Sequence, residues 1–409
     1  GTMTEGESSR ASPCQEDSVT DQTAAPDTSA PKRSPLHAVH EAAGATFTDF
    51  GGWLMPVRYN SDLAEHHAVR TAAGLFDISH MAELAVSGPQ AAAFLDYALA
   101  ANVSALQLSK AKYTMILQPD GGVIDDLIVY RNSPTEFLVV ANAGNRDVVV
   151  HELRERIEGF DAALHDGTEA ISLIAVQGPL AEQILLATDG LQHDATVAMG
   201  HSLADLPYYA CMGMRFRGAS VLVARTGYTG EDGFELFIDA GRAAELWAAL
   251  LEAGTPLGLV PCGLAARDTL RLEAGMPLYG HELGRDRLPV QSGLGRVVPL
   301  KTKTADFVGR AAIEAGPAEG ARVLVALAAD GRRAGRADAA VLASAAPGAP
   351  VIGMVTSGAL SPTLGYPIAM ASVDPAFAEL GTELAIDVRG TALPATVVAM
   401  PFYTRPAAS

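Results

Sequence analysis

Cysteine is scarce in this chain, and long apolar runs are missing from it. Only three of the 409 residues are cysteines, and no two of them have the close spacing of a zinc site or a redox motif. An odd cysteine count also gives no disulfide framework, so we expect the protein to work in the reducing cytoplasm. No run of about 18 uninterrupted apolar residues occurs, which predicts that nothing spans a membrane.

Positive charge is scarce as well. The chain has 29 lysines and arginines against 47 aspartates and glutamates, which gives a net charge of −18. A phosphate backbone is repelled by such a balance, so nucleic acid is not an expected partner. A site for an anion would have to concentrate positive charge locally.

Several motifs that mark common enzyme classes are also missing. No dinucleotide fingerprint opens the chain, and no Gly-Lys-Ser/Thr phosphate loop or Gly-x-Ser-x-Gly turn follows later. His80 and the pair His66-His67 have no second cluster of ligand residues to match them, so we expect no metal. The missing fingerprint argues equally against a flavin domain.

The length of the chain predicts two or three domains, because single cores stop growing at about 250–300 residues. Residues 1–33 are rich in Ser, Thr, Asp, Glu, Pro and Ala, which predicts a disordered acidic tail without signal or transit features. From residue 321 onward, short apolar segments alternate with Gly, Pro and Ala, as in an all-β module. We therefore divide the chain into 1–33, 34–320 and 321–405.

The middle region mixes helix and strand patterns. Helices are predicted for 35–47, 62–77 (ending at its Ala-Gly step), 89–100, 146–160 and 243–254. Strands are predicted for 82–87, 171–178, 220–225 and 234–240, and three more within 112–142, where Asp-Gly-Gly and Asn-Ser-Pro mark turns. Because strand–helix–strand–strand units occur twice, we expect two ferredoxin-like (split βαβ) halves and the α+β class.

The segment "GGVIDDLIVY" places two aspartates in a strand. Alternate residues share a face, so Ile124, Asp126, Ile128 and Tyr130 point one way and Asp125 the other. A carboxyl group among aliphatic side chains is costly to ionise, and burial raises its pKa. On the residues alone, a catalytic carboxylate competes with a turn cap or a solvent-facing aspartate.

The segment "RTGYTGEDGFEL", 225–236, holds three glycines and three carboxylates between two predicted strands. It has neither the lysine of a phosphate loop nor the spacing of a calcium loop. In the following strand Phe234, Leu236 and Ile238 share one face, and Glu235 and Phe237 share the other. A carboxylate accepts two parallel N–H bonds and could hold a flat ring; the alternative is the exposed face of an edge strand.

A third candidate is "GLAARDTLRLEAGMPLYG", 263–280. Arg267 and Arg271 lie four residues apart and so share one helix face. These arginines could reach a ligand or belong to a salt-bridged surface helix.

Together these segments form a recognisable set. "FGGWLMPVRY", "GLFDISHM", "YTMILQPDGGVIDDLIVY", "AVQGP", "RTGYTGEDGFEL", "CGLAARDTLRLEAGMPLYG" and "TSGALSPTLG" follow one another in this order. In order and spacing, from about residue 35 to 405, the chain resembles the aminomethyltransferase (T-protein) family of the glycine cleavage system. The resemblance implies a clover-leaf arrangement with a central channel. Two intertwined α+β subdomains (34–80 with 167–320, and 81–166) and a C-terminal β-barrel domain make up this arrangement.

The resemblance also implies an activity. Members of this family transfer the methylene of an aminomethyl group from the lipoyl arm of H-protein to tetrahydrofolate, with release of ammonia. Tetrahydrofolate is the co-substrate, and H-protein is the partner; we expect a monomer. Asp126 matches the catalytic aspartate, and Asp125 would be a bystander. The folate-binding positions matched by the resemblance are Met81, Ala85, Tyr113, Ile128, Tyr130, Asn142, Tyr228, Glu235, Arg267 and Tyr403.

The chain departs from the family pattern at two of the expected positions. Arg296 stands where some relatives have a tryptophan, and we expect it to meet the glutamate tail of folate. Ala85 is smaller than the leucine of some relatives.

Two other functions remain as alternatives: a folate-dependent demethylation module and a non-enzymatic folate-binding factor for iron–sulfur assembly. The first usually accompanies a flavin domain. The second carries a cysteine-containing signature where this chain reads "EAGMPLYGHEL".

Overall fold

The computed structural model describes residues 29–196 and 202–407. The chain divides into two units, Gly1–Ala30 and Pro31–Ser409, and the described helices and strands all belong to the second. Residues 1–28 of the predicted disordered tail lie outside the described residues. Its last two residues, Lys32 and Arg33, instead form strand β1 and pair with β3.

Helices and strands alternate along the described residues from β1 to α8. The helices are α1 (His37–Ala42), α2 (Asp62–Thr71), α3 (Ala91–Ala98), α4 (Arg146–Arg156), α5 (Ala181–Ala187), α6 (Ala243–Gly254), α7 (Leu264–Glu273) and α8 (Arg310–Ala315). None of the helices in the described part of the chain is long and apolar enough to cross a bilayer.

The strands in the described part of the chain form three sheets and a barrel. A seven-stranded sheet has the order β11 (Leu191–His193), β12 (Cys211–Phe216), β13 (Ala219–Ala224), β14 (Gly233–Asp239), β10 (Ile171–Gln177), β4 (Ala73–Asp77), β15 (Leu259–Cys262). A five-stranded sheet has the order β6 (Ala111–Leu117), β7 (Val123–Ser133), β8 (Glu136–Ala141), β5 (Ala82–Ser87), β9 (Ala163–Asp166). A small sheet joins β1 (Lys32–Arg33), β3 (Trp53–Arg58) and β2 (Thr46–Phe50).

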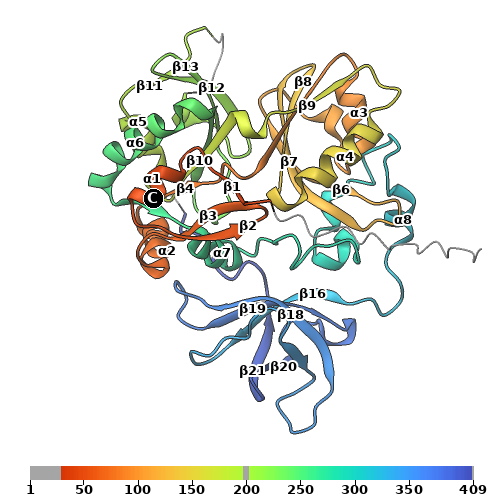
Figure 1. Cartoon of the computed structure of the whole chain (residues 1–409). Helices are drawn as coiled ribbons and strands as arrows, with labels where there is room; N and C mark the ends of the chain where they lie inside the picture. Colours follow the sequence, from red (N-terminus) through yellow and green to blue (C-terminus); the bar gives the residue numbers. More distant parts are fainter. Residues whose placement is uncertain (1–28, 197–201, 408–409) are drawn as a thin grey trace, which may run out of the picture. The chain divides into compact units, whose positions relative to one another are not determined.

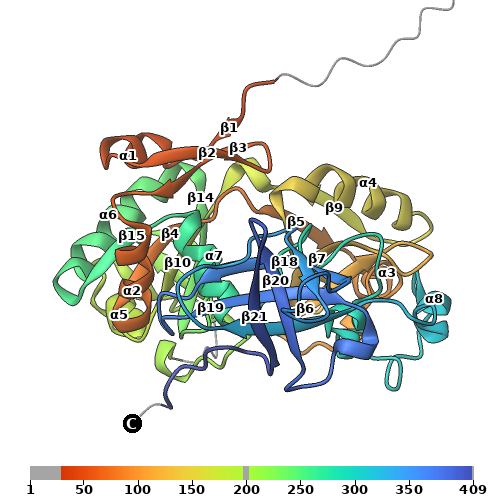
Figure 2. The ribbon, with the colours of Figure 1, turned by 90° about the horizontal axis from the view of Figure 1, so that it is seen from below.

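The C-terminal module is a closed six-stranded barrel, which confirms the predicted all-β region. Its strands are β16 (Val323–Ala329), β19 (Pro367–Val373), β18 (Val351–Leu360), β17 (Ala340–Leu342), β20 (Glu383–Val388) and β21 (Thr391–Val398). Within Pro31–Ser409, Figure 1 shows this barrel below the lobes built on the two large sheets. Viewed from below in Figure 2, the barrel strands lie in front of both lobes. The α+β class with a C-terminal barrel is therefore confirmed.

Both large sheets are buried on two faces, which explains why their strands are apolar throughout. In β10, Ile174 and Val176 pack under α5 and α6. Leu173 and Ala175, the alternate residues, face the other large sheet in a central cluster. A strand covered on both sides needs apolar residues at every position. The central cluster therefore brings the two sheets face to face.

The two sheets meet at a pair of matching turns. Ser109 and Tyr209 both adopt positive φ, 62° and 59°, which is uncommon for residues other than glycine. Each precedes a residue of an isolated antiparallel bridge, Lys110 with Ala210. The main chain continues this pairing, because the amide of Ala111 donates to Tyr209 at 2.8 Å. The start of β6 is thereby joined to the start of β12.

An arginine supports each of these turns in the same way. The Arg131 guanidinium donates to the carbonyl of Leu106 at 2.7 Å, and Arg225 donates to that of Leu206 at 3.0 Å. Each guanidinium also lies over a phenylalanine ring of its own half. In each lobe, an arginine stacked on a phenylalanine thus holds the turn at the edge where the two sheets meet.

The helix predicted within 62–77 is confirmed, and it ends just before the Ala-Gly step that was expected to stop it. Helix α2 begins after Ser61, whose side chain accepts from the amide of Ala64, and it ends at Thr71. Residues Ala73–Asp77 are instead the fully buried strand β4, which pairs with β10 and β15. Helix propensity predicts the structure of so short an apolar segment poorly. Its hydrogen bonding to a strand on each side determines the structure instead.

A buried polar network connects α2 and α7 with the barrel. The Glu273 carboxylate accepts from Arg70 at 2.8 Å and from the Thr363 hydroxyl at 2.7 Å, and His66 lies 3.1 Å from it. Burial opposes ionisation of Glu273. Hydrogen bonds from His66, Ser361 and Thr363 outweigh burial and lower its pKa to about 2.

Replacing Glu273 with glutamine should destabilise the protein by about 3–5 kcal/mol, because it breaks a buried ion pair and leaves Arg70 without that carboxylate. The lowered pKa also predicts a pH dependence. The stabilisation from Glu273 is complete above its ordinary pKa of 4.5 and is lost as the pH falls toward about 2. Denaturant unfolding of wild type and Glu273→Gln across this range measures both effects. Glu252→Gln, at an exposed position of α6, is the control. Equal pH slopes for wild type and Glu273→Gln would contradict the prediction.

Candidate functional site

A cavity of about 560 Å³ lies between the two large sheets and beside α7. This volume is typical of a small-molecule site. Its walls come from β7, β8, β10, β14, α7 and the hairpin β2–β3. Nine of the residues expected to bind folate or act in catalysis line it: Met81, Tyr113, Asp126, Ile128, Tyr130, Asn142, Tyr228, Glu235 and Arg267.

An irregularity in β7 decides which side chains share the face of Asp126. The pairing with β6 shifts between Asp125 and Val123, so Ile124 is an extra residue. A bulge of this kind reverses the alternation locally. Ile124 therefore packs with Leu127 in the core under α3 and α4, and its predicted place on the face of Asp126 is wrong.

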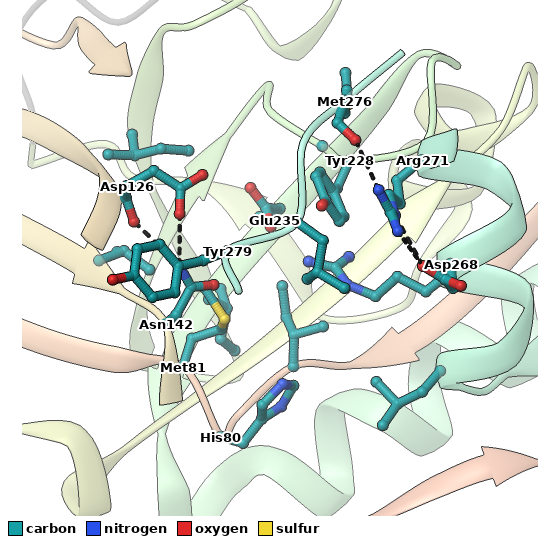
Figure 3. Close-up of a pocket in the computed structure, with 18 of the residues that line it drawn as sticks. His80, Met81, Asp126, Asn142, Tyr228, Glu235, Asp268, Arg271, Met276 and Tyr279 are labelled. Carbon is teal, nitrogen blue, oxygen red and sulfur yellow. Dashed lines mark hydrogen bonds and ion pairs between the residues drawn. The ribbon is translucent and has the colours of Figure 1, made fainter. Parts of the chain in front are cut away.

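Asp126 reaches the cavity with part of its hydrogen-bonding capacity unused. Its carboxylate accepts from the Tyr113 hydroxyl at 2.9 Å and from the Asn142 amide at 2.7 Å. Burial raises the pKa of Asp126, and these two hydrogen bonds oppose the rise. In Figure 3, Asp126 lies at one end of the cavity with Asn142, Met81 and Tyr279.

Asp125, the other member of the pair, turns away from the cavity. It is completely buried and binds the segment after β8. Its carboxylate accepts from the main-chain amide of Asn142 at 3.0 Å and from the Asn145 side chain at 2.7 Å. Burial and the charge of Asp126 raise the pKa of Asp125 to about 8.

Glu235 enters the cavity from the opposite sheet. Phe234, Leu236 and Ile238 pack under α5 and α6, while Phe237 joins the central cluster, so the predicted alternation of β14 is confirmed. Glu235 is 8% exposed and lines the cavity. Burial raises its pKa, opposed by a hydrogen bond from Thr226 and by the charge of Arg267.

Arg267 and Tyr228 form a flat wall beside Glu235. The Arg267 guanidinium stacks over the Tyr228 ring at 4.8 Å, and the Tyr228 hydroxyl donates to the carbonyl of Pro277. Burial lowers the pKa of Arg267. No acceptor for its guanidinium is found among residues 29–196 and 202–407, so its donors remain available to a ligand.

Two of the three carboxylates in segment 225–236 anchor the loop. Glu231 accepts from Arg70 and from the Tyr403 hydroxyl, both at 2.8 Å. Asp232 accepts two hydrogen bonds from Arg225, at 2.9 and 2.7 Å. Of the three, Glu235 alone is directed into the cavity. The carboxylates of this motif therefore divide between holding the loop and facing the ligand.

The glycines of the segment make room for a protein side chain. A Cβ atom at Gly227 would lie 2.0 Å from the Gln177 side chain, and one at Gly233 would lie 2.4 Å from it. Gln177, from the motif "AVQGP", is completely buried and donates to the carbonyl of Thr226 at 3.0 Å. These glycines therefore let the backbone approach Gln177 closely, and Gln177 fixes the loop against β10.

Three predicted binding residues do not line this cavity. Ala85 is exposed within β5, four residues beyond Met81, which lines the cavity just before that strand. Arg296 is exposed in the segment 295–297. Tyr403 packs on Arg70, with 4.1 Å between guanidinium and ring centroid, and its hydroxyl is occupied by Glu231.

Several lining residues lie outside the set of folate-binding positions that the resemblance implies. Tyr279 donates to the carbonyl of Val123, and Arg271 pairs with Glu282 at 2.7 Å. His80 is 2% exposed; burial and then the charge of Arg267 lower its pKa to about 4. The motifs "DISHM" and "GMPLYG" contain or adjoin these residues, but nothing in a strand or helix pattern shows that their loops meet in space.

The residue types at the site suit an organic ligand better than a metal. Within the described ranges, no group of three or more His, Cys, Asp or Glu side chains could hold a metal ion. The cavity instead combines apolar walls with carboxylates at two separate places and a stacked guanidinium. Such a site can hold a flat heterocycle by its N–H edge and keep a second carboxylate near its reactive nitrogens.

Comparison with known proteins agrees with this arrangement. Two family models match, the GCVT N-terminal domain over residues 36–302 and the glycine cleavage T-protein C-terminal barrel domain over 322–404. The chain is 55% identical over 374 residues to the aminomethyltransferase of Cutibacterium acnes, covering 91% of this chain and 99% of that protein. It is 54% identical over 380 residues to that of Saccharopolyspora erythraea, covering 92% and 99%.

A solved structure is similar over the same length. It is the crystal structure of glycine cleavage system aminomethyltransferase T from Bartonella henselae, with a TM-score of 0.81 and 36% identity over 91% of this chain and 98% of that one. The first family model alone covers more than half of the chain, and the relatives match nearly all of it. The chain therefore belongs to the glycine cleavage T-protein family.

Proposed function

We propose that this protein transfers the methylene of an aminomethyl group, carried on the lipoyl arm of an H-protein, to tetrahydrofolate. Ammonia and 5,10-methylenetetrahydrofolate are the products. The observation that supports this most strongly is that one cavity receives Asp126 from one sheet and Glu235 from the other. Tetrahydrofolate supplies the nitrogen atoms that accept the one-carbon unit.

The donor set of the cavity fits a reduced pterin. A pterin ring presents a 2-amino group beside a ring N–H, which is a forked donor edge. Glu235 has Thr226 as its hydrogen-bond donor, so its carboxylate keeps room to accept both N–H groups. Arg267 and Tyr228 provide a stacked surface beside that edge. We infer that Glu235, Tyr228 and Arg267 hold the ring.

Asp126 acts at the other end of the ring. Its carboxylate is oriented by Tyr113 and Asn142 and lies in a largely apolar cavity, where a charge acts more strongly than in water. We infer that Asp126 stabilises positive charge that develops on the ligand and accepts the proton that a tetrahydrofolate N–H loses when its nitrogen bonds the methylene carbon. Met81, Ile128 and Tyr130 exclude water from this end.

The alternatives are not favoured. The relatives that match almost the whole chain are named aminomethyltransferases, which argues for transfer rather than demethylation or a non-enzymatic role. We further propose that the lipoyl arm of the H-protein enters the cavity, and that Arg296 contacts the folate glutamate tail outside it. No second function is supported by a specific observation.

Replacing Asp126 with asparagine keeps the shape of the side chain and removes its charge. We expect kcat to fall by about 100-fold or more, because general-base and charge contributions of this size are typical. Ammonia release from aminomethylated carrier in the presence of tetrahydrofolate measures the effect, with Asp161→Asn at an exposed site as the control. If the variant turns over within about threefold of wild type, the charge of Asp126 lowers the activation free energy by no more than about 0.7 kcal/mol, which would contradict the proposed role.

The same carboxylate predicts the pH profile of the reaction. Because burial raises the pKa of Asp126 above its ordinary 3.8, activity should fall as the pH decreases through that raised value. The acidic limb should be missing from the profile of Asp126→Asn. An unchanged limb in that variant would assign the titration to another group.

Replacing Glu235 with glutamine should weaken tetrahydrofolate binding by about 10- to 100-fold. One of the two carboxylate oxygens that accept from the forked pterin edge is then replaced by an NH₂ donor. Equilibrium binding of tetrahydrofolate measures this loss. The matched control is Glu245→Gln at an exposed position of α6. Binding of the Glu235 variant equal to that of the control would show that the pterin edge lies elsewhere.

A further inference from the structure

Asp125 is completely buried beside the cavity, yet the proposed reaction gives it no role. Its carboxylate receives three hydrogen bonds: the main-chain amide of Asn142 at 3.0 Å, the Asn142 side chain at 2.7 Å and the Asn145 side chain at 2.7 Å. Two of the three come from Asn142, a residue that lines the cavity. The contacts of Asp125 are thus directed at a wall of the site.

The side-chain nitrogen of Asn142 lies between the two aspartates. It is 2.7 Å from an oxygen of Asp125 and 2.7 Å from an oxygen of Asp126, and it also lies 3.2 Å from the Asp126 carbonyl. An amide group has two N–H donors and one carbonyl acceptor. The carboxylates on both sides therefore accept hydrogen bonds from this atom. These contacts identify it as the NH₂ group of the amide and not as its carbonyl oxygen.

The oxygen of that amide remains for the cavity. Within residues 29–196 and 202–407, no donor to the side-chain oxygen of Asn142 is found, and this oxygen is not among the enclosed polar atoms without a partner. When both carboxyl groups are ionised, the opposite orientation would bring a carbonyl oxygen against two anions, which is repulsive. The arrangement therefore presents a hydrogen-bond acceptor, and not a donor, next to Asp126.

We propose that Asp125 is a positioning residue that orients the Asn142 amide, so that its oxygen accepts an N–H of the reduced pterin. This inference rests on the proposed function. Asp125 acts through Asn142 and contacts no ligand itself.

Asp125 and Asp126 are also electrostatically coupled. Burial raises the pKa of both, and the charge of Asp126 adds to the rise at Asp125. The titratable groups around the pair are the tyrosines Tyr113, Tyr209, Tyr228 and Tyr279, all with raised pKa values, and Arg285 next to Tyr279. Because these tyrosines stay neutral below the ordinary tyrosine range, a coupled pair of carboxyls should titrate in two steps.

A double-mutant cycle on tetrahydrofolate binding tests the proposal. We expect Asp125→Asn to weaken binding about tenfold, because the new amide can donate to Asn142 and allow it to turn over. Asn142→Ala should weaken binding by a similar factor. The double variant should bind no more weakly than Asn142→Ala alone, because Asp125 has then lost the group it orients. Asp96→Asn, a buried aspartate of α3 that accepts from the amide of Ser104, is the matched control and should bind as wild type does.

A second measurement separates positioning from a purely structural role. Tetrahydrofolate affinity of the wild type as a function of pH should show one more titration step than that of Asp125→Asn, because Asp126 and Glu235, whose pKa values are also raised, titrate in both proteins. If Asp125→Asn does not fold, Asn145→Ala removes one of the hydrogen bonds of Asp125 and should weaken binding by a few fold while leaving Asn142 in place.

The outcomes distinguish this inference from the proposed function. If the wild type does not bind tetrahydrofolate, the proposed function fails and the inference fails with it. If the wild type binds but Asp125→Asn binds equally well, the inference is overturned and the proposed function stands. Losses that multiply in the double variant, or equal numbers of titration steps in the wild type and Asp125→Asn, would also overturn it.

Discussion

A carboxylate that is removed from much of the solvent and yet keeps free acceptor positions is costly for a folded protein. One cavity of this structure contains two of them, the half-buried Asp126 and the buried Glu235. Asp126 and Glu235 each receive hydroxyl donors from the protein, Tyr113 and Thr226, and both retain acceptor capacity. Burial raises the pKa of each. Such groups persist where a ligand completes their hydrogen bonding, because an unsatisfied buried charge is otherwise penalised. The rest of the fold can be understood as the support for these two side chains.

That support comes from two sheets held face to face. Each sheet is covered by helices on its outer face, and each contributes one carboxylate from its inner face. The paired turns at Ser109 and Tyr209 join the sheets at an edge, and the network around Glu273 ties α7, which carries Arg267, to the barrel. Residues that resemble ligand contacts in sequence, such as Glu231 and Tyr403, serve this support. A site assembled from separate lobes needs many such anchors to keep its groups at fixed positions.

Much of this could be predicted from the sequence, for identifiable reasons. Period-two alternation placed Glu235 and Phe237 on one face of β14, because a regular strand obeys that period. The same rule failed at Ile124, because a bulge is set by the partner strand β6 and leaves no local signal. Strand β4 at Ala73–Asp77 was not predicted, because a short run of mostly apolar and small residues suits either a helix end or a buried strand.

Side-chain partners were the least predictable part of the site. Nothing in the segment 225–236 shows that Glu231 meets Arg70 while Glu235 enters the cavity. Tyr403 and Arg70 are separated by more than three hundred residues, and their contact depends on the return of the chain from the barrel. Ala85 and Arg296 lie outside the cavity because of how their strand and loop are arranged in three dimensions, which the local sequence does not show.

The central claim is that Asp126 and Glu235 hold the same ligand from opposite sheets. A crystal structure of the protein with tetrahydrofolate bound tests it most directly. We expect the N–H edge of the pterin on the Glu235 carboxylate and the reduced nitrogens of the same ring facing Asp126. A pterin bound outside the cavity, or one that contacts only one of these carboxylates, would contradict it.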